Sequence, residues 1–151
     1  MGAVTYPDPE VSHMIEEHFV PVQFNVVEQP EVMERFNTPW TPTLIVQDAE
    51  GKEHRRSQGY LDAKRFLAEM AIARLMAAVD RRDFRAAASL AGPAQRMTEG
   101  DPMREPEALY WSSVTAYKDA NDPNLLLSGW NRLLDSFPQS EWAHKVEFIR
   151  Q

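Results

Sequence analysis

The stretch WTPTLIVQDAEGKEHRRSQG, residues 40–59, predicts a β-hairpin. TLIVQ, Thr43–Gln47, is an apolar run rich in β-forming residues, which favours a buried strand. DAEG, Asp48–Gly51, has the acidic and glycine composition of a hairpin loop and leads into the polar run EHRRSQ. We therefore expect two antiparallel strands. The second is polar enough to lie only at an edge of the sheet, where the basic residues 54–56 discourage pairing with other chains.

The residues before this hairpin predict a helix, a strand and a helical turn. Asp8–Glu17 combines an acidic start, an early proline and apolar residues at helical spacing, which is typical of an amphipathic helix. In Phe19–Val27 the β-branched and aromatic residues stand too close together for one helical face, so we expect a buried strand. Pro30 opens a helical turn that ends near Asn37, before the prolines of NTPWTP interrupt it.

The residues after the hairpin predict a long helix over Asp62–Val79. Apolar residues form two separate stripes on it, one containing Phe66 and Met70 and the other containing Ile72 and Met76. A helix that is apolar on two sides is usually covered on both. We expect one face to cover the sheet and the other to receive the helices that follow.

The polar run DRRD, Asp80–Asp83, marks the predicted boundary between a first domain, residues 1–80, and a helical region, residues 81–151. The helical region contains a weak internal repeat, because GDPMREPEA near Gly100 aligns with SFPQSEWA near Ser136 about one tetratricopeptide period apart. The stretch from EALYWSSVTAYKDANDP to LLDSFPQSEWA resembles a tetratricopeptide unit. Only about one and a half repeats fit, and about three are needed for an independent superhelix.

Composition excludes several classes of function. The 151 residues carry 16 Lys and Arg against 23 Asp and Glu, a formal net charge of −7, and no cysteine. The lack of cysteine excludes disulfides, thiolate zinc sites, iron–sulfur clusters and cysteine nucleophiles. We expect no nucleic-acid partner, because an acidic chain without a basic run is poorly suited to bind phosphates. We expect no membrane partner and a cytoplasmic location, because no apolar run approaches the ~20 residues of a membrane span and no secretory signal is present.

Other candidate sites give weaker signals. His13 and His18 are separated by about 140° around a helix and so point to different faces, which argues against a metal site. His13 and Glu17 have the spacing of a surface pair. The tryptophans of the helical region lie at helical spacing, which favours packing between helices over a ligand groove; they are Trp111, Trp130 and Trp142. No HExxH, GxSxG, P-loop or GxGxxG motif is present, so we expect no catalytic residue, no cofactor and no metal.

The order of the predicted elements, with the segment WTPT between helix and strand, is similar to the C-terminal part of the thioredoxin fold. TYPDPEV, Thr5–Val11, resembles a segment of the periplasmic thiol:disulfide interchange proteins. In that family the proline of the TPT segment is cis and leaves the preceding backbone free to pair with an extended peptide. The resemblance implies a cis Pro42, a peptide-contacting Thr41 and a strand closed by Gly59. Trp40 lies beside Pro42, where it serves either a substrate surface or packing.

The resemblance breaks off before Thr5. Family members have a central strand and the Cys-x-x-Cys helix start there, and this chain has only Met1–Val4. Thiol–disulfide exchange requires two sulfurs, so the resemblance implies a redox-inactive protein. The strands beside the absent one would keep unpaired backbone groups. We therefore expect a homodimer in which a second copy supplies the missing surface.

Together these observations predict an α/β fold, in which a truncated thioredoxin-like sheet of about three strands is packed by helices and followed by an all-α, tetratricopeptide-like region. The leading hypothesis is a binding module that holds a protein or peptide partner at Trp40, Thr41 and Pro42 and is not an enzyme. Two alternatives stay open. One is a thioredoxin-type oxidoreductase whose Cys-x-x-Cys segment lies upstream of Met1, and the other is an assembly adaptor that uses the helical tail.

Overall fold

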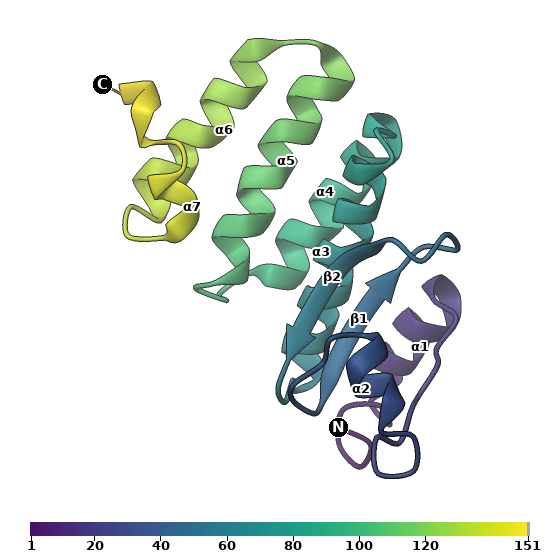
Figure 1. Ribbon diagram of the computed structural model, residues 1–151. Coiled ribbons are helices and arrows are strands. Elements are labelled where there is room, and N and C mark those ends of the chain that lie inside the picture. The colour runs from purple at the N-terminus through teal and green to yellow at the C-terminus, as the bar shows by residue number, and fades with distance from the viewer. Residues whose placement is uncertain (151) are drawn as a thin grey trace. The chain divides into compact units, whose positions relative to one another are not determined.

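The computed structural model describes residues 1–150 and divides the chain into two compact units, Met1–Leu67 and a second that begins at Ala68 (Figure 1). The division falls inside helix α3, Ala63–Asp80, whereas the sequence suggests a boundary after residue 80. The predicted and observed boundaries differ because the polar run only marks the end of α3. Packing contacts assign the first turn of α3 to the first unit and the rest of the helix to the second.

The first unit begins with helix α1, Pro9–His18, at the place where the sequence predicts an amphipathic helix. Asp8 caps it, since its carboxylate accepts hydrogen bonds from the backbone N–H groups of Glu10 and Val11 at 2.9 and 3.2 Å. Pro9 occupies the first helical position, where its missing N–H leaves no bond unmade. Val11 and Met14 form the buried side of α1.

The predicted strand over Phe19–Val27 is wrong, because this segment is an extended coil between α1 and α2. Val20 and Val22 are 92% and 71% exposed, and no backbone group of residues 20–24 forms a hydrogen bond within residues 1–150. A strand is stable only when a neighbouring strand pairs with its backbone, and Pro21 also removes one donor. The apolar pattern of a strand is present here without a partner strand.

Helix α2, Glu31–Arg35, confirms the predicted helical turn, and Asn37, two residues after its end, adopts the left-handed conformation at φ 47°. Strand β1, Thr43–Gln47, then pairs antiparallel with β2, Glu53–Gln58, and confirms the predicted hairpin. The sheet that the structure describes in residues 1–150 has these two strands, one fewer than predicted, because Phe19–Val27 does not join it.

The loop of the hairpin is held by one carboxylate. One oxygen of Asp48 accepts a hydrogen bond from the backbone N–H of Lys52 at 2.8 Å, and the other lies 2.9 Å from Nε2 of His54. Gly51 has φ +83°, a conformation that a glycine adopts without strain. The side chain of His54 is only 1% exposed, so this residue of the polar strand is buried and not part of a solvated edge.

Acid is expected to weaken this hairpin through Asp48. Desolvation raises the pKa of Asp48, but the hydrogen bonds from Lys52 and His54 outweigh it and leave the pKa below its ordinary value. A lowered folded-state pKa stabilises the fold above the unfolded pKa, and this contribution disappears as the pH falls through the folded value.

The measurement is urea unfolding between about pH 7 and pH 2, monitored through the amide signal of Lys52 in NMR spectra. We expect the native chain to be more stable than Asp48→Asn at neutral pH, with the difference shrinking below about pH 4. A difference that is independent of pH would contradict an ionised Asp48 as the source of this stability.

The second unit is helical. In α3, residues of both predicted apolar stripes are buried, among them Met70 and Ile72. Its later residues share one core with helices α4, Phe84–Thr98, and α5, Arg104–Ala120. Small side chains dominate this core and allow the helices to approach closely; its buried members are Ala71, Leu75, Ala78, Ala87, Ala94 and Ala108.

Helix α6, Pro123–Ser136, lies antiparallel to α5 (Figure 1), after a turn in which Asn121 adopts φ 53° and Asp122 caps the new helix. Short helices α7, Glu141–His144, and η1, Glu147–Arg150, follow.

Aromatic side chains fill the space between α5, α6 and α7. Tyr110 stacks on Trp130 with 5.6 Å between ring centroids, and Trp111 contacts Trp142 at 6.2 Å. The predicted packing of the three tryptophans between helices is confirmed. Within residues 1–150 no helix is both long and apolar enough to span a bilayer.

Candidate peptide-binding loop

The predicted site residues lie together in the turn that connects α2 to β1. The side chain of Trp40 is 67% exposed, and Thr41 and Pro42 are also exposed. The Thr41–Pro42 peptide bond is cis, as predicted. The hydroxyl of Thr43, the first residue of β1, donates a hydrogen bond to the carbonyl oxygen of Trp40 at 2.7 Å and closes the turn from inside.

The end of β2 supports the same turn. The backbone N–H of Gly59 donates to the carbonyl oxygen of Pro42 at 2.8 Å and so ends the pairing of β1 with β2 beside the cis bond. Gly59 has φ +95°, a backbone conformation that other residues adopt only with strain. The position of Gly59 therefore agrees with the strand-closing glycine that the resemblance implies.

An arginine from β2 holds the chain just before the turn. The guanidinium of Arg56 donates to the carbonyl oxygen of Phe36 at 2.9 Å and forms an ion pair with Glu53 at 2.6 Å. The hydrogen bond that Arg56 donates to Glu53 raises the pKa of Arg56. Sequence reasoning treated Arg56 only as an edge-strand charge. Positions 53 and 56 lie on opposite faces of a regular strand, so the sequence indicated neither the pair with Glu53 nor the contact with Phe36. The strand is irregular beside Glu53, where the register of β1 and β2 shifts.

Backbone groups at the turn are available to a ligand. The N–H and C=O of Thr41 form no hydrogen bond within the described residues, and the side chain of Trp40 stands beside them in solvent. Unpaired backbone groups of this kind are the groups with which an extended peptide pairs when it adds to the edge of a sheet.

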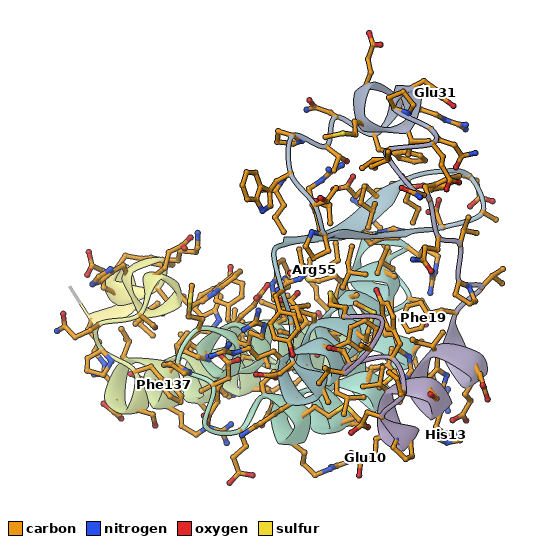
Figure 2. The ribbon with its side chains drawn as sticks, turned by 90° about the horizontal axis from the view of Figure 1, so that it is seen from below. Glu10, His13, Phe19, Glu31, Arg55 and Phe137 are labelled. Atoms are coloured by element: carbon orange, nitrogen blue, oxygen red, sulfur yellow. The ribbon has the colours of Figure 1, made fainter. Side chains whose placement is uncertain are left out.

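The extended segment contributes further exposed apolar surface to the first unit. It runs from Phe19, where α1 ends, toward Glu31, where α2 begins (Figure 2). The ring of Phe24 packs on Phe36 with 6.0 Å between centroids but stays 42% exposed. Val27 is 86% exposed. These side chains form an apolar strip, residues 20–27, of which Val20, Val22 and Val27 are the most exposed members.

The histidines of α1 lie apart from this turn. Nε2 of His13 lies 3.0 Å from a carboxylate oxygen of Glu17, and both side chains are mostly exposed, which confirms the predicted surface pair. His18 also lies beside Glu17, at 3.6 Å. Within residues 1–150 no group of three or more His, Cys, Asp or Glu side chains is arranged to hold a metal ion.

Comparison with known proteins agrees with the resemblance drawn from the residues. The family model described as a thioredoxin-like domain matches residues 1–73. Searches of curated proteins and of solved structures gave no match. The matched residues include α1, the turn at Pro42 and the β1–β2 hairpin. The chain therefore carries a thioredoxin-like domain in residues 1–73, followed by a helical C-terminal region.

Proposed function

We propose that the first unit is a binding module that holds an extended segment of a partner protein at the turn formed by Trp40, Thr41 and Pro42. The observation that carries this proposal is the combination of an exposed indole and unpaired backbone groups at neighbouring positions of one turn. Backbone pairing at Thr41 supplies affinity for an extended chain, and an apolar side chain of the ligand covers Trp40. Exposed tryptophans are frequent energetic centres of such interfaces.

The test is a selection of ligands followed by substitution of the turn. A phage-displayed decapeptide library is selected on the full chain, and the affinity of the recovered peptides is measured by calorimetry. We expect Trp40→Ala to weaken the binding of these peptides by about tenfold or more, because loss of a central aromatic side chain typically costs over 1 kcal/mol of binding free energy.

Phe148→Ala serves as the matched control, since Phe148 is an aromatic residue of similar exposure, 60%, in the second unit. Unchanged binding by Phe148→Ala together with weakened binding by Trp40→Ala supports the turn as the site. The reverse pattern contradicts it and supports the assembly-adaptor alternative, in which the helical region carries the partner.

We further propose that residues 1–151 have no thiol–disulfide oxidoreductase activity, because the sequence contains no cysteine to attack or to resolve a disulfide. The rate of insulin reduction by the pure chain in the presence of dithiothreitol should equal that of the buffer control. Turnover above that control would refute this part of the proposal.

The alternative of an oxidoreductase is favoured by one observation, the unpaired extended segment 20–24, which is suited to receive a further strand. The DNA upstream of Met1 tests it. An in-frame segment that encodes an apolar strand followed by Cys-x-x-Cys would replace the binding-module proposal with the enzyme.

A homodimer is the predicted state of the isolated chain. The apolar strip of residues 20–27 combines exposed valines with an unpaired backbone over residues 20–24, and two copies of such a segment can pair antiparallel across a two-fold axis. Light scattering over a dilution series should give the mass of a dimer at micromolar concentration, and Val22→Glu should give a monomer. Val4→Glu is the control, since Val4 is 67% exposed outside the strip. A native chain that is monomeric and cooperatively folded would refute the dimer.

A further inference from the structure

The second unit contains a cavity of about 350 Å³ at the junction of α4, α5 and α6. None of its lining residues belongs to the turn at Pro42, and it serves none of the functions considered above. Its lining combines charged side chains of both signs with apolar ones; the residues that matter here are Arg96, Glu99, Glu105, Leu109, Arg132 and Phe137.

Two guanidinium groups in this lining lack an opposite charge. Arg132 donates one hydrogen bond, at 3.1 Å, to the neutral amide oxygen of Gln95. The guanidinium of Arg96 forms no hydrogen bond or ion pair with any residue that the structure describes. Guanidinium groups bind carboxylates through paired, charge-assisted hydrogen bonds. The α4 and α6 sides of the cavity therefore offer a carboxylate two unused partners.

The two acidic residues of the lining differ in their contacts. A carboxylate oxygen of Glu105 accepts a hydrogen bond from the backbone N–H of Gly100 at 2.8 Å. The carboxylate of Glu99 forms no hydrogen bond or ion pair with any described residue. This carboxylate is thus available to a cation. Because two arginines and two glutamates line the cavity, their formal charges cancel and a ligand of zero net charge fits better than a polyanion such as phosphate.

The remaining lining is apolar. Leu109 of α5 is 5% exposed, and Phe137 lies half-buried directly after α6 (Figure 2). Together they offer a surface for an apolar group of the ligand, and the hydroxyl of Ser136 lies in the same lining. A volume near the lower end of known ligand pockets limits the ligand to a small molecule.

We propose that this cavity binds an α-amino acid with an apolar side chain. Its carboxylate pairs with Arg96 and Arg132, its ammonium group pairs with Glu99, and its side chain covers Leu109 and Phe137. Such a molecule has zero net charge and places groups of opposite sign close together beside an apolar group. It therefore offers one group to each of the three kinds of lining, the unpaired guanidinium groups, the carboxylate of Glu99 and the apolar side chains.

The experiment is a titration of the ¹⁵N-labelled full chain, followed by the amide signals of Ser136 and Phe137. The probes are L-leucine, N-acetyl-L-leucine, which lacks the ammonium charge, and L-leucinamide, which lacks the carboxylate. We expect saturable shifts with L-leucine at millimolar concentration and binding weaker by at least about tenfold with each of the other two, since each loses one charged pair. An absence of saturable shifts with L-leucine, or equal binding of N-acetyl-L-leucine, would overturn the proposal.

Substitutions then assign the partners. Arg132→Gln and Glu99→Gln should each weaken the binding of L-leucine by at least about tenfold. Arg85→Gln is the matched control, because Arg85 is an exposed arginine of α4 that does not line the cavity. All three residues are exposed, so the variants should fold, and circular dichroism checks this. Equal effects of Arg132→Gln and Arg85→Gln would show a general charge effect and would refute the site.

Discussion

Replacing Arg104 by alanine is expected to lower the free energy of unfolding of the second unit by about 3–5 kcal/mol. The guanidinium of Arg104 lies between two carboxylates, with Nε 2.6 Å from Glu69 of α3 and a terminal nitrogen 2.8 Å from Asp101. The side chain of Glu69 is only 6% exposed, so alanine would remove a cation from a carboxylate that water barely reaches. Loss of one member of a buried ion pair is costly because the remaining charge stays desolvated.

Asp101 also connects this ion-pair cluster to the backbone at the start of α5. Its carboxylate accepts hydrogen bonds from the backbone N–H groups of Met103 and Arg104 at 3.0 and 3.1 Å. Burial raises the pKa of Asp101, but these hydrogen bonds and the guanidinium of Arg104 lower it by more. The pair therefore contributes stability above the ordinary carboxyl pKa, and that contribution is lost as the pH falls through the lowered value.

Urea unfolding followed by tryptophan fluorescence measures the change at neutral pH. Glu141→Gln is the control, because its pair with Lys145 at 2.7 Å is exposed and should contribute much less to stability than the buried pair. Equal losses of stability in Arg104→Ala and Glu141→Gln would show that burial of Glu69 does not govern the strength of the pair.

The second large effect is expected from Gly129→Ala, which should destabilise the second unit by about 1–3 kcal/mol. Gly129 of α6 faces Ser113 of α5, and a Cβ atom at position 129 would lie 2.6 Å from the Cβ of Ser113. Carbon atoms that are not linked by covalent bonds do not approach to that distance, so the two helices would have to separate. The hydroxyl of Ser113 donates to the carbonyl oxygen of Leu109 at 2.7 Å, which holds the side chain in place.

A second substitution tests this explanation. Ser113→Gly in the Gly129→Ala background leaves the Cα of residue 113 at 3.5 Å from the new Cβ, an ordinary contact, and should restore much of the packing. Gly92→Ala in α4 is the matched control. The nearest atom to a Cβ there is the mobile end of Arg96 at 3.4 Å, so the change should stabilise the helix by up to about 1 kcal/mol. Destabilisation by Gly92→Ala equal to that of Gly129→Ala would refute the close approach as the cause.

Local chemistry made much of the first unit predictable. Asp8 and Pro9 begin α1 because capping and a preset φ act within a few residues, and the loop from Asp48 to Gly51 turns the chain for the same reason. The turn residues Trp40, Thr41 and Pro42 could be named as a candidate site from the segment WTPT. The structure places the three residues together in one exposed turn, and their role in binding stays a prediction.

Contacts between distant residues were decided by tertiary structure. The carbonyl oxygen that Arg56 binds belongs to Phe36, twenty residues away, and no local pattern selects it. The close approach of Gly129 to Ser113 and the joining of Arg104 to Glu69 depend in the same way on how helices cross.

The segment Phe19–Val27 shows most directly which features local sequence determined and which ones tertiary structure decided. Its β-branched and aromatic residues favour an extended backbone, and Phe19 has extended angles, φ −136° and ψ 157°, although residues 26–28 form a turn. Whether it becomes a strand depends on hydrogen bonds to a neighbouring strand, and no described residue forms them. The preference of a residue for an extended backbone is local, whereas a strand also needs a second strand within hydrogen-bond distance. The sequence by itself therefore determined the local preference, and tertiary structure alone determined the pairing.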